Sequence, residues 1–413
     1  MNSRPERTLP ETRRRRVLVC APFPPHLDAR HGGKATSQLL RRLAERNDVA
    51  LLCLRGTHEE GVDPEIAGRC GLVEEVPLTP TTGRLARYAA WGLGMLRGLP
   101  PWAIDCRSGE YADRLRHLVE TWEPDVVEIH LQAMAQYVDM LERANVATIL
   151  VDYDPGSAWA DEVRALTAGP RRLARWVEVA AWRRYEQKTR PRFDAIVVFA
   201  ERDVAAVEPT AGGTPIVRVP YAVEIPPRPL DPEGSDPPRI LFVGSFGHPP
   251  NVDAAVWLAT RLFPRVLERV PHARLDLVGH EPGEEVRALT GGPVSVHASV
   301  PDVTPYMNRA AVVAAPIRIG GSMRMKVLEA LGAGKALVAT PRAAEGVEAT
   351  AGEHYVLAED EDELVDALAR LLVDRDLRRT LGEHARAWAI RNLGWERGAE
   401  AFESLYDSLI EAS

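Results

Sequence analysis

The chain has 413 residues, of which 45% are hydrophobic and 27% charged, and its formal net charge is -8. This length allows two domains of ordinary size, each with its own core. The acidic balance argues against a nucleic-acid-binding protein, and no apolar run is long enough to cross a membrane. The composition is typical of a globular protein.

The N-terminal end is basic, with arginines at 13–16 before the first apolar run, and we interpret residues 1–16 as a disordered basic arm. That apolar run is too short for a signal peptide. The first half of the chain contains four cysteines without a C-x-x-C pair: Cys20, Cys53, Cys70 and Cys106. This pattern is typical of reduced thiols, so we expect a cytoplasmic protein.

Apolar, strand-like runs alternate with amphipathic helical stretches along the chain. The expected strands are residues 17–20, 49–54, 126–129, 148–151, 195–199, 216–219, 240–243, 274–278, 312–315 and 336–339. The clearest helical stretches are residues 35–46, 254–269, 363–372 and 377–391. This alternation predicts an α/β fold of two doubly wound, Rossmann-like domains with parallel sheets.

A proline-rich stretch, residues 226–239, is the expected linker, because its six prolines cannot continue a helix or a central strand. We therefore expect an N-terminal domain over 17–225 and a C-terminal domain over 240–394, followed by a helix within 395–413. Parallel sheets bind ligands at the carboxyl ends of their strands, so the expected site is a cleft where the two domains face each other.

The stretch 320–340, GGSMRMKVLEALGAGKALVAT, carries the clearest motif. Two glycines and Ser322, a preferred N-cap residue, open a predicted helix whose free N–H groups suit phosphate. Ser322, Lys326 and Glu329 then share one helical face. This suits a nucleoside diphosphate, with Lys326 on the phosphates and Glu329 accepting from ribose hydroxyls. An ordinary amphipathic helix after a glycine turn is the alternative.

The segment resembles the nucleotide-binding segment of retaining GT-B glycosyltransferases of family 4, the glycosyl transferases group 1. Their usual pattern is two glutamates separated by seven residues, then alanine, a glycine turn and a strand. The second half matches Glu329–Lys335, whereas Gly321 stands where the first glutamate is expected. A branch of the family carries Arg-x-Lys here, as Arg324-Met325-Lys326 does. Backbone must then hold donor hydroxyls that a carboxylate usually holds.

The resemblance implies the GT-B fold, with the donor in the second domain, the acceptor on the first, and a C-terminal helix returning to the first domain. It also implies a glycosyltransferase that retains anomeric configuration and uses a GDP-, UDP- or ADP-linked sugar. The acceptor can be a small molecule, a saccharide or a lipid. Cations and helix N–H groups stabilise the phosphates, so we expect no metal and no cofactor.

In the second domain, Leu241–Gly247 resembles the family's strand and glycine loop, but Ser245 replaces the usual arginine. A buried diphosphate needs positive partners, and Lys326 and Arg318 are the local candidates. The residue after a short strand, His297, and nearby Val300 occupy the expected base-binding loop. The expected diphosphate contacts are Gly33, Gly244, Ser245, Arg318, Gly321, Ser322, Met323 and Lys326.

In the first domain, the resemblance implies that the loop glycines Gly32 and Gly33 contact the substrates: Gly32 on the acceptor side and Gly33 at the donor phosphate. His130 ends a strand, where a lone histidine is more often a satisfied polar residue. Many family members have a histidine there that orients the donor sugar, so His130 is our catalytic candidate. Asp152, after the next strand, is an acceptor-side candidate or a loop residue.

Two other functions stay open on the same fold. One is a nucleotide-sugar 2-epimerase, although the acid–base side chains it needs cannot be placed in this sequence. The other is a degenerate nucleotide-sugar-binding subunit, because the first glutamate and the clamp cations are missing. The apolar stretch Leu85–Trp102 suits core packing, an acceptor pocket or contact with a membrane surface.

Overall fold

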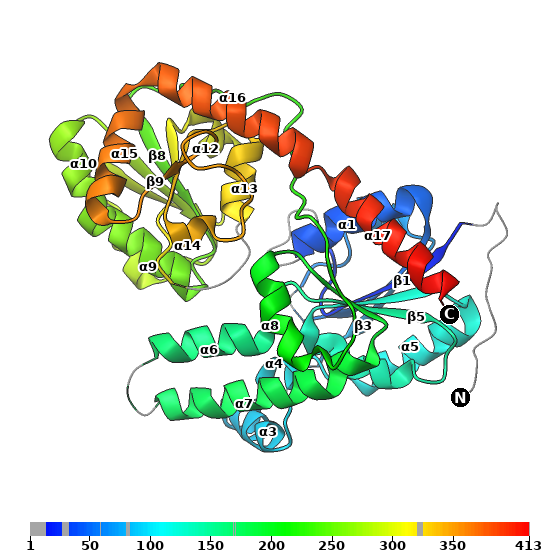
Figure 1. Cartoon of the computed structure of the whole chain (residues 1–413). Helices are drawn as coiled ribbons and strands as arrows, with labels where there is room; N and C mark the ends of the chain where they lie inside the picture. Colours follow the sequence, from blue (N-terminus) through cyan, green and yellow to red (C-terminus); the bar gives the residue numbers. More distant parts are fainter. Residues whose placement is uncertain are drawn as a thin grey trace. The chain divides into compact units, whose positions relative to one another are not determined.

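The computed structural model describes residues 14–26, 33–57, 59–79, 83–167, 169, 171–319 and 325–412. The chain divides into two compact units. The first unit runs to Tyr221 and resumes at Trp395, and the second unit is Ala222–Gly394 (Figure 1). Each unit contains one parallel sheet, so the predicted α/β class with two doubly wound sheets is confirmed.

The sheet of the first unit has the order β3-β2-β1-β4-β5-β6-β7. Its strands are β1 (Arg16–Ala21), β2 (Asp48–Arg55), β3 (Leu72–Pro77), β4 (Val126–His130), β5 (Ala147–Val151), β6 (Ala195–Val198) and β7 (Ile216–Arg218). The central strands are mostly apolar and almost completely buried, as expected for a parallel sheet covered on both faces, although β4 also contains Glu128 and His130. All of their carboxyl ends therefore lie at one edge.

The helices of the first unit connect and cover these strands. They are α1 (Gly33–Arg46), α2 (Pro64–Arg69), α3 (Arg84–Leu96), α4 (Pro101–Asp105), α5 (Gly109–Trp122), η1 (Gln132–Met140), α6 (Gly156–Leu166), α7 (Arg171–Thr189), η2 (Arg190–Arg192), α8 (Glu201–Ala211) and α17 (Trp395–Glu411).

The C-terminal helix α17 packs on the first unit, against α1 (Figure 1). Arg46 of α1 pairs with Glu403 at 3.1 Å, and Arg42 pairs with Glu396 at 3.2 Å. Arg15, directly before β1, reaches the same helix and donates to the backbone oxygen of Glu403 at 2.9 Å. The described residues thus include the end of the arginine run, and Arg16 opens β1.

The sheet of the second unit has the order β10-β9-β8-β11-β12-β13. Its strands are β8 (Arg239–Val243), β9 (Arg274–Gly279), β10 (Val294–Ala298), β11 (Val312–Ala315), β12 (Leu337–Ala339) and β13 (Val356–Leu357). Its helices are α9 (Pro249–Trp257), η3 (Leu258–Leu262), α10 (Phe263–Arg269), α11 (Glu284–Arg287), α12 (Thr304–Arg309), α13 (Met325–Gly332), α14 (Pro341–Ala344), α15 (Glu361–Val373) and α16 (Arg375–Asn392).

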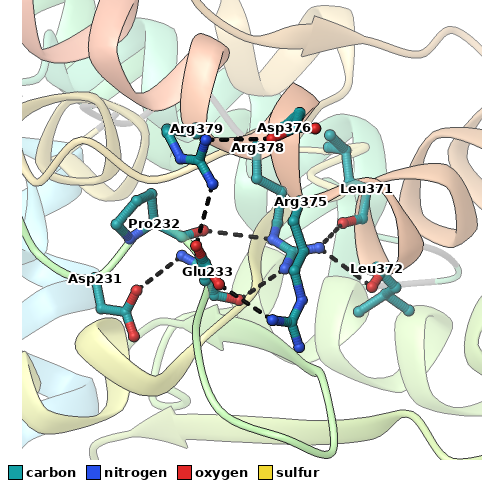
Figure 2. Close-up of polar contacts among 9 residues, drawn as sticks. All are labelled: Asp231, Pro232, Glu233, Leu371, Leu372, Arg375, Asp376, Arg378 and Arg379. Carbon is teal, nitrogen blue, oxygen red and sulfur yellow. Dashed lines mark hydrogen bonds and ion pairs between the residues drawn. The ribbon is translucent and has the colours of Figure 1, made fainter.

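The proline-rich stretch is docked on the second unit. Figure 2 shows Arg378 of α16 at the centre of this contact: its guanidinium donates to the backbone oxygens of Leu371 at 2.6 Å and Glu233 at 2.9 Å. The Glu233 carboxylate pairs with Arg375 at 3.2 Å and Arg379 at 3.1 Å. Backbone oxygens that no strand uses are thus satisfied by a buried arginine.

Lys335, after α13, holds the same stretch from the other side. Its ammonium is buried and donates to the backbone oxygens of Asp231 and Asn308. Burial lowers the pKa of Lys335 from 10.5 to about 8. The neutral carbonyl partners do not compensate the charge fully, so the ammonium is destabilised relative to the unfolded chain.

This shift predicts a stability that rises with pH. Between pH 8 and 10.5 the unfolded chain binds more protons at Lys335 than the folded chain, so the free energy of unfolding should increase across this window. Lys335→Met should abolish a rise of up to about 3 kcal/mol, measured by urea unfolding as a function of pH. The exposed Lys188→Met is the control. An identical pH profile for the wild type and Lys335→Met would contradict the prediction.

Candidate functional site

Two neighbouring strands of the second unit end in glycines that contact each other. A Cβ built on Gly279, at the end of β9, would lie 1.8 Å from the backbone oxygen of Gly244, directly after β8. No other residue fits at Gly279 without moving this loop. The loop is held further by the Gly244 N–H, which donates to the oxygen of Val278 at 3.0 Å. The strand ends thus bring Gly244 and Ser245 to the carboxyl edge of the sheet.

Asn251 in α9 connects this loop to the predicted phosphate-binding helix. Its amide nitrogen donates to the backbone oxygen of Ser245 at 2.9 Å, and its amide oxygen accepts from the Lys326 ammonium in α13. Lys326 also lies over the ring of Phe242, 5.2 Å from its centroid. The Ser245 hydroxyl is buried, and no hydrogen-bond partner for it lies in the described ranges. Lys326, Gly244 and Ser245 therefore lie together.

Arg318, in the loop after β11, contacts α9, the helix that contains Asn251. Its guanidinium pairs with both carboxylate oxygens of Asp253, at 2.6 and 3.1 Å, and covers the Trp257 ring at 4.4 Å. A bidentate pair of this kind holds the guanidinium plane in one orientation. Arg318 is thus anchored to the turn of α9 that carries Asn251, and its side chain is 44% exposed.

Glu329 lies three residues after Lys326 in α13 and is half-buried, so both side chains share one face of the helix. Gly321, Ser322 and Met323 are outside the described residues. The helix is described from Met325 onward, and it ends at Gly332 before β12. The ribose role of Glu329 stays a prediction.

His297 lies in β10, and its imidazole contacts the buried Asp276 carboxylate of β9 at 3.0 Å. Arg239 and Arg309 pair with the same carboxylate at 3.1 and 3.4 Å. Val300 follows the strand and is half-buried. These contacts account for the position of the His297 imidazole without a ligand, so the base-binding role of His297 and Val300 stays a prediction.

In the first unit, His130 ends β4 and is 1% exposed. Its Nε2 lies 2.9 Å from a carboxylate oxygen of Glu128, two residues earlier on the same face of the strand. The other Glu128 oxygen accepts from the Tyr406 hydroxyl of α17. Burial raises the pKa of Tyr406 well above its usual value, and the Glu128 carboxylate raises it further. The buried carboxylate is thus hydrogen-bonded at both oxygens.

The second ring nitrogen of His130 lies 3.2 Å from the Tyr153 hydroxyl, which lies 3.3 Å from the Thr36 hydroxyl of α1. A carboxylate only accepts, so with neutral His130 the Nε2 carries the proton and Nδ1 is an acceptor. The Tyr153 ring stacks on Phe199 with centroids 4.9 Å apart. His130 thus presents an acceptor nitrogen to hydroxyl groups at the carboxyl edge of the sheet.

Asp152 is completely buried and pairs with Arg190 of η2 at 2.6 Å. Arg190, also completely buried, lies 3.4 Å from Glu186 of α7. Burial raises the pKa of both carboxyls, and the Arg190 charge opposes this shift. The acceptor-side role of Asp152 stays a prediction, since this ion pair accounts for its position.

The remaining expectations concern the glycines at the start of α1, metal binding, membrane helices and the cysteines. Gly33 is the first residue of α1, and Gly32 is outside the described residues. In the described ranges no three His, Cys, Asp or Glu side chains gather in a way that could hold a metal ion. No helix in that part of the chain has the length and apolarity needed to span a membrane. All four cysteines are free.

Sequence reasoning missed several members of these clusters: Glu128, Tyr406, Asn251 and Asp253. Glu128 had a detectable signal, because a charged residue inside an otherwise apolar parallel strand must be paired. Its position two residues before His130 puts both on one face. Tyr406 and Asp253 had no such signal, since their partners are remote in the sequence.

Residues 237–374, within the second unit, match the family model described as Glycosyl transferases group 1. The chain is 32% identical over 143 residues to D-inositol 3-phosphate glycosyltransferase of Corynebacterium jeikeium (strain K411), which covers 34% of this chain and 32% of that protein. The chain thus matches about a third of the length of this curated relative.

Solved structures resemble the chain over almost its whole length. A sucrose-phosphate synthase from Thermosynechococcus elongatus matches with a TM-score of 0.70 and 15% identity over 97% of this chain and 100% of that chain. Anabaena HepE, in complex with UDP and glucose, matches with a TM-score of 0.63 and 12% identity over 95% of this chain and 99% of that chain. At these identities the matches confirm the GT-B fold and nothing finer.

The buried ion pairs of the first unit predict a large loss of stability for Arg190→Met. This variant leaves Asp152 and Glu186 buried without their cation, which should lower the free energy of unfolding by about 3–5 kcal/mol in chemical denaturation. Arg183→Met, at an exposed position of α7, should change it by less than about 0.5 kcal/mol. Equal effects of the two variants would show that the buried pairs add nothing.

Proposed function

We propose that the protein is a glycosyltransferase that moves a sugar from a nucleotide diphosphate sugar to an acceptor, with retention of anomeric configuration and without a metal ion. The observation that carries this proposal is the cluster of Lys326, Asn251 and Ser245 at the carboxyl edge of the second sheet. The buried Ser245 hydroxyl has no partner in the described part of the chain, and a phosphate oxygen would satisfy it. The cluster lies within the segment that matches the group 1 family.

In this proposal the Lys326 ammonium binds the diphosphate, together with the Ser245 hydroxyl and backbone near Gly244. Arg318 contributes positive charge from its anchored position on Asp253. Gly33, Gly321, Ser322 and Met323 complete the phosphate contacts. Glu329 binds the ribose, and backbone around His297 and Val300 binds the base. Lys326 replaces the clamp cations that the glycine loop lacks, because a buried diphosphate requires charge compensation.

The proposed reaction needs no acid–base carboxylate pair. The acceptor oxygen forms its bond to the anomeric carbon on the face from which the phosphate departs, and the bond between that carbon and the phosphate oxygen breaks. The acceptor's proton passes to the departing phosphate oxygen. Positive charge and N–H groups that stabilise the phosphate, with correct positioning of the acceptor, then supply the rate acceleration.

His130 is the proposed catalytic residue of the first unit. Its Nδ1 accepts from the Tyr153 hydroxyl in this structure, and a donor-sugar hydroxyl would use the same acceptor nitrogen. Glu128 fixes the imidazole through Nε2, so the ring keeps this orientation. Gly32 and Asp152 complete the acceptor side. A cytoplasmic location also belongs to this proposal.

The first test concerns the donor site. We expect UDP, GDP, ADP or dTDP to raise the melting temperature, since a ligand that binds the folded state stabilises it. UDP is the first choice, because Anabaena HepE was solved with UDP and with UDP-glucose. Lys326→Ala should weaken binding of the stabilising diphosphate by about 1–3 kcal/mol in calorimetry, with little effect on the nucleoside.

Arg274→Ala is the matched control, because Arg274 is exposed at the start of β9, whereas the proposed donor site lies at the carboxyl ends of the strands. It should leave diphosphate affinity unchanged. Unchanged affinity in Lys326→Ala would remove Lys326 from the donor site. Absence of a thermal shift with all four diphosphates would overturn the proposed function.

The second test separates a catalytic from a packing role of His130. His130→Asn should lower kcat about tenfold or more with little change in donor affinity, because it removes the positioned acceptor nitrogen. Tyr406→Phe removes a hydrogen bond to the same buried Glu128. Each of the two variants should lower the free energy of unfolding by about 1 kcal/mol, but Tyr406→Phe should keep its activity. Steady-state kinetics and unfolding of both variants, at a temperature where both are folded, make the comparison. Equal losses of kcat in the two variants would mark His130 as a packing residue.

A further inference from the structure

The first unit contains a cavity of about 390 Å³ lined by tryptophans. Four of them contribute from four helices: Trp91 of α3, Trp102 of α4, Trp159 of α6 and Trp182 of α7. Figure 1 shows α6 and α7 as a pair of long helices beside α3. The volume is in the range of small-molecule sites, and such sites are mostly apolar with a few polar groups.

The aromatic wall depends on a glycine at the start of α6. A Cβ on Gly156 would lie 2.5 Å from the Trp182 ring, so any larger residue would displace this ring from the cavity. On the other side, the Trp91 indole donates to the Asp105 carboxylate at 2.9 Å, and Arg87 pairs with the same carboxylate at 2.6 Å. These contacts fix the aromatic faces without using a ligand.

A residue that lines the cavity, Gln132, has a buried polar atom for which the described residues offer no partner. Gln132, in η1, is 2% exposed, and its amide nitrogen donates to the backbone oxygen of Asp154. A carbonyl only accepts, so this contact identifies which end of the amide is nitrogen and which is oxygen. The oxygen, Oε1, is buried and has no hydrogen-bond partner in the described ranges. A buried acceptor of this kind requires a donor.

We propose that this cavity is the acceptor site and that it takes a planar, mostly apolar ring compound bearing a hydroxyl group that donates to Gln132 Oε1. The inference rests on the proposed function for the identity of the reaction. Tryptophan faces bind flat rings, and one unpartnered acceptor suits one hydroxyl. The lining also contains charged side chains, but Arg87 and Asp105 pair with each other at 2.6 Å, and Glu178 pairs with Arg175 at 2.5 Å. A mostly apolar ring therefore suits this cavity better than a free saccharide, which has hydroxyls all round its ring.

The cavity adjoins the residues proposed for catalysis. Gln132 follows His130 by two residues at the end of β4, and Asp154 follows Tyr153 after β5. The Gln132–Asp154 hydrogen bond therefore connects the same two strand ends that the His130–Tyr153 contact connects. A ring in the cavity would place its hydroxyl at the strand edge where transfer is proposed.

The test uses 7-hydroxy-4-methylcoumarin as the probe. Its 7-methoxy analogue is the comparison compound, because it cannot donate a hydrogen bond to Gln132 Oε1. In calorimetry the hydroxyl compound should bind the full chain about three- to tenfold more tightly than the methoxy compound. Gln132→Met should abolish this difference. Trp102→Ala, at a position 40% exposed, should weaken both compounds about two- to tenfold.

Trp176→Ala is the matched control, because Trp176 of α7 is 50% exposed and does not line the cavity. It should bind both compounds like the wild type. Formation of the coumarin glycoside from UDP-glucose, detected by mass spectrometry and lost in Trp102→Ala, would support the acceptor role.

UDP binding to the same samples tests the donor site independently. If UDP binds but the hydroxycoumarin does not, or binds equally to wild type, Gln132→Met and Trp102→Ala, the cavity is not this acceptor site and the proposed function stands. If neither UDP nor another diphosphate binds, the proposed function fails instead. A free monosaccharide that competes with the coumarin would overturn the proposed ligand class.

Discussion

The buried carboxylate of Glu128 is the constraint around which the first unit is arranged. A charge with no solvent exposure in the middle of a parallel sheet is costly unless both oxygens are hydrogen-bonded. One partner, Tyr406, comes from α17 at the far end of the chain, and the other is His130 on the same strand. The single carboxylate therefore ties the C-terminal helix to the sheet and orients the histidine at the sheet's edge.

The second unit solves a similar problem with an amide. Asn251 can donate and accept at once, so it binds the backbone after β8 and the Lys326 ammonium together. The close contact between Gly244 and Gly279 requires glycine at position 279, because a Cβ there would clash with the Gly244 backbone oxygen. Both units thus gather their polar groups at the carboxyl ends of parallel strands, which is where the alternating order of strands and helices leads them.

Buried polar groups divide into two kinds in this protein. Arg378, Arg190 and Asp276 have partners from the chain itself, and these contacts account for the packing of the proline-rich stretch and the sheets. Ser245 Oγ and Gln132 Oε1 are buried without partners in the described residues. Other buried atoms, among them Arg190 Nε and Asp152 Oδ1, also have no hydrogen-bond partner there. Ser245 and Gln132 differ from these in their place, because one belongs to the proposed donor site and the other lines the tryptophan-lined cavity, so their unsatisfied atoms support a ligand at each.

The sequence by itself determined the α/β class, the two parallel sheets and the segment around Lys326, because these follow from local periodicity, turn residues and a contiguous motif. It also placed His130 at a strand end, whereas the burial of this side chain is seen only in the structure. Strands such as β3, with charged residues in its middle, escaped the apolar pattern. Only the tertiary structure decided which side chains meet: Tyr406 with Glu128, Arg318 with Asp253, and the four tryptophans around one cavity. These pairs are separated by tens to hundreds of residues, and no local pattern encodes contacts that form only when separate elements pack.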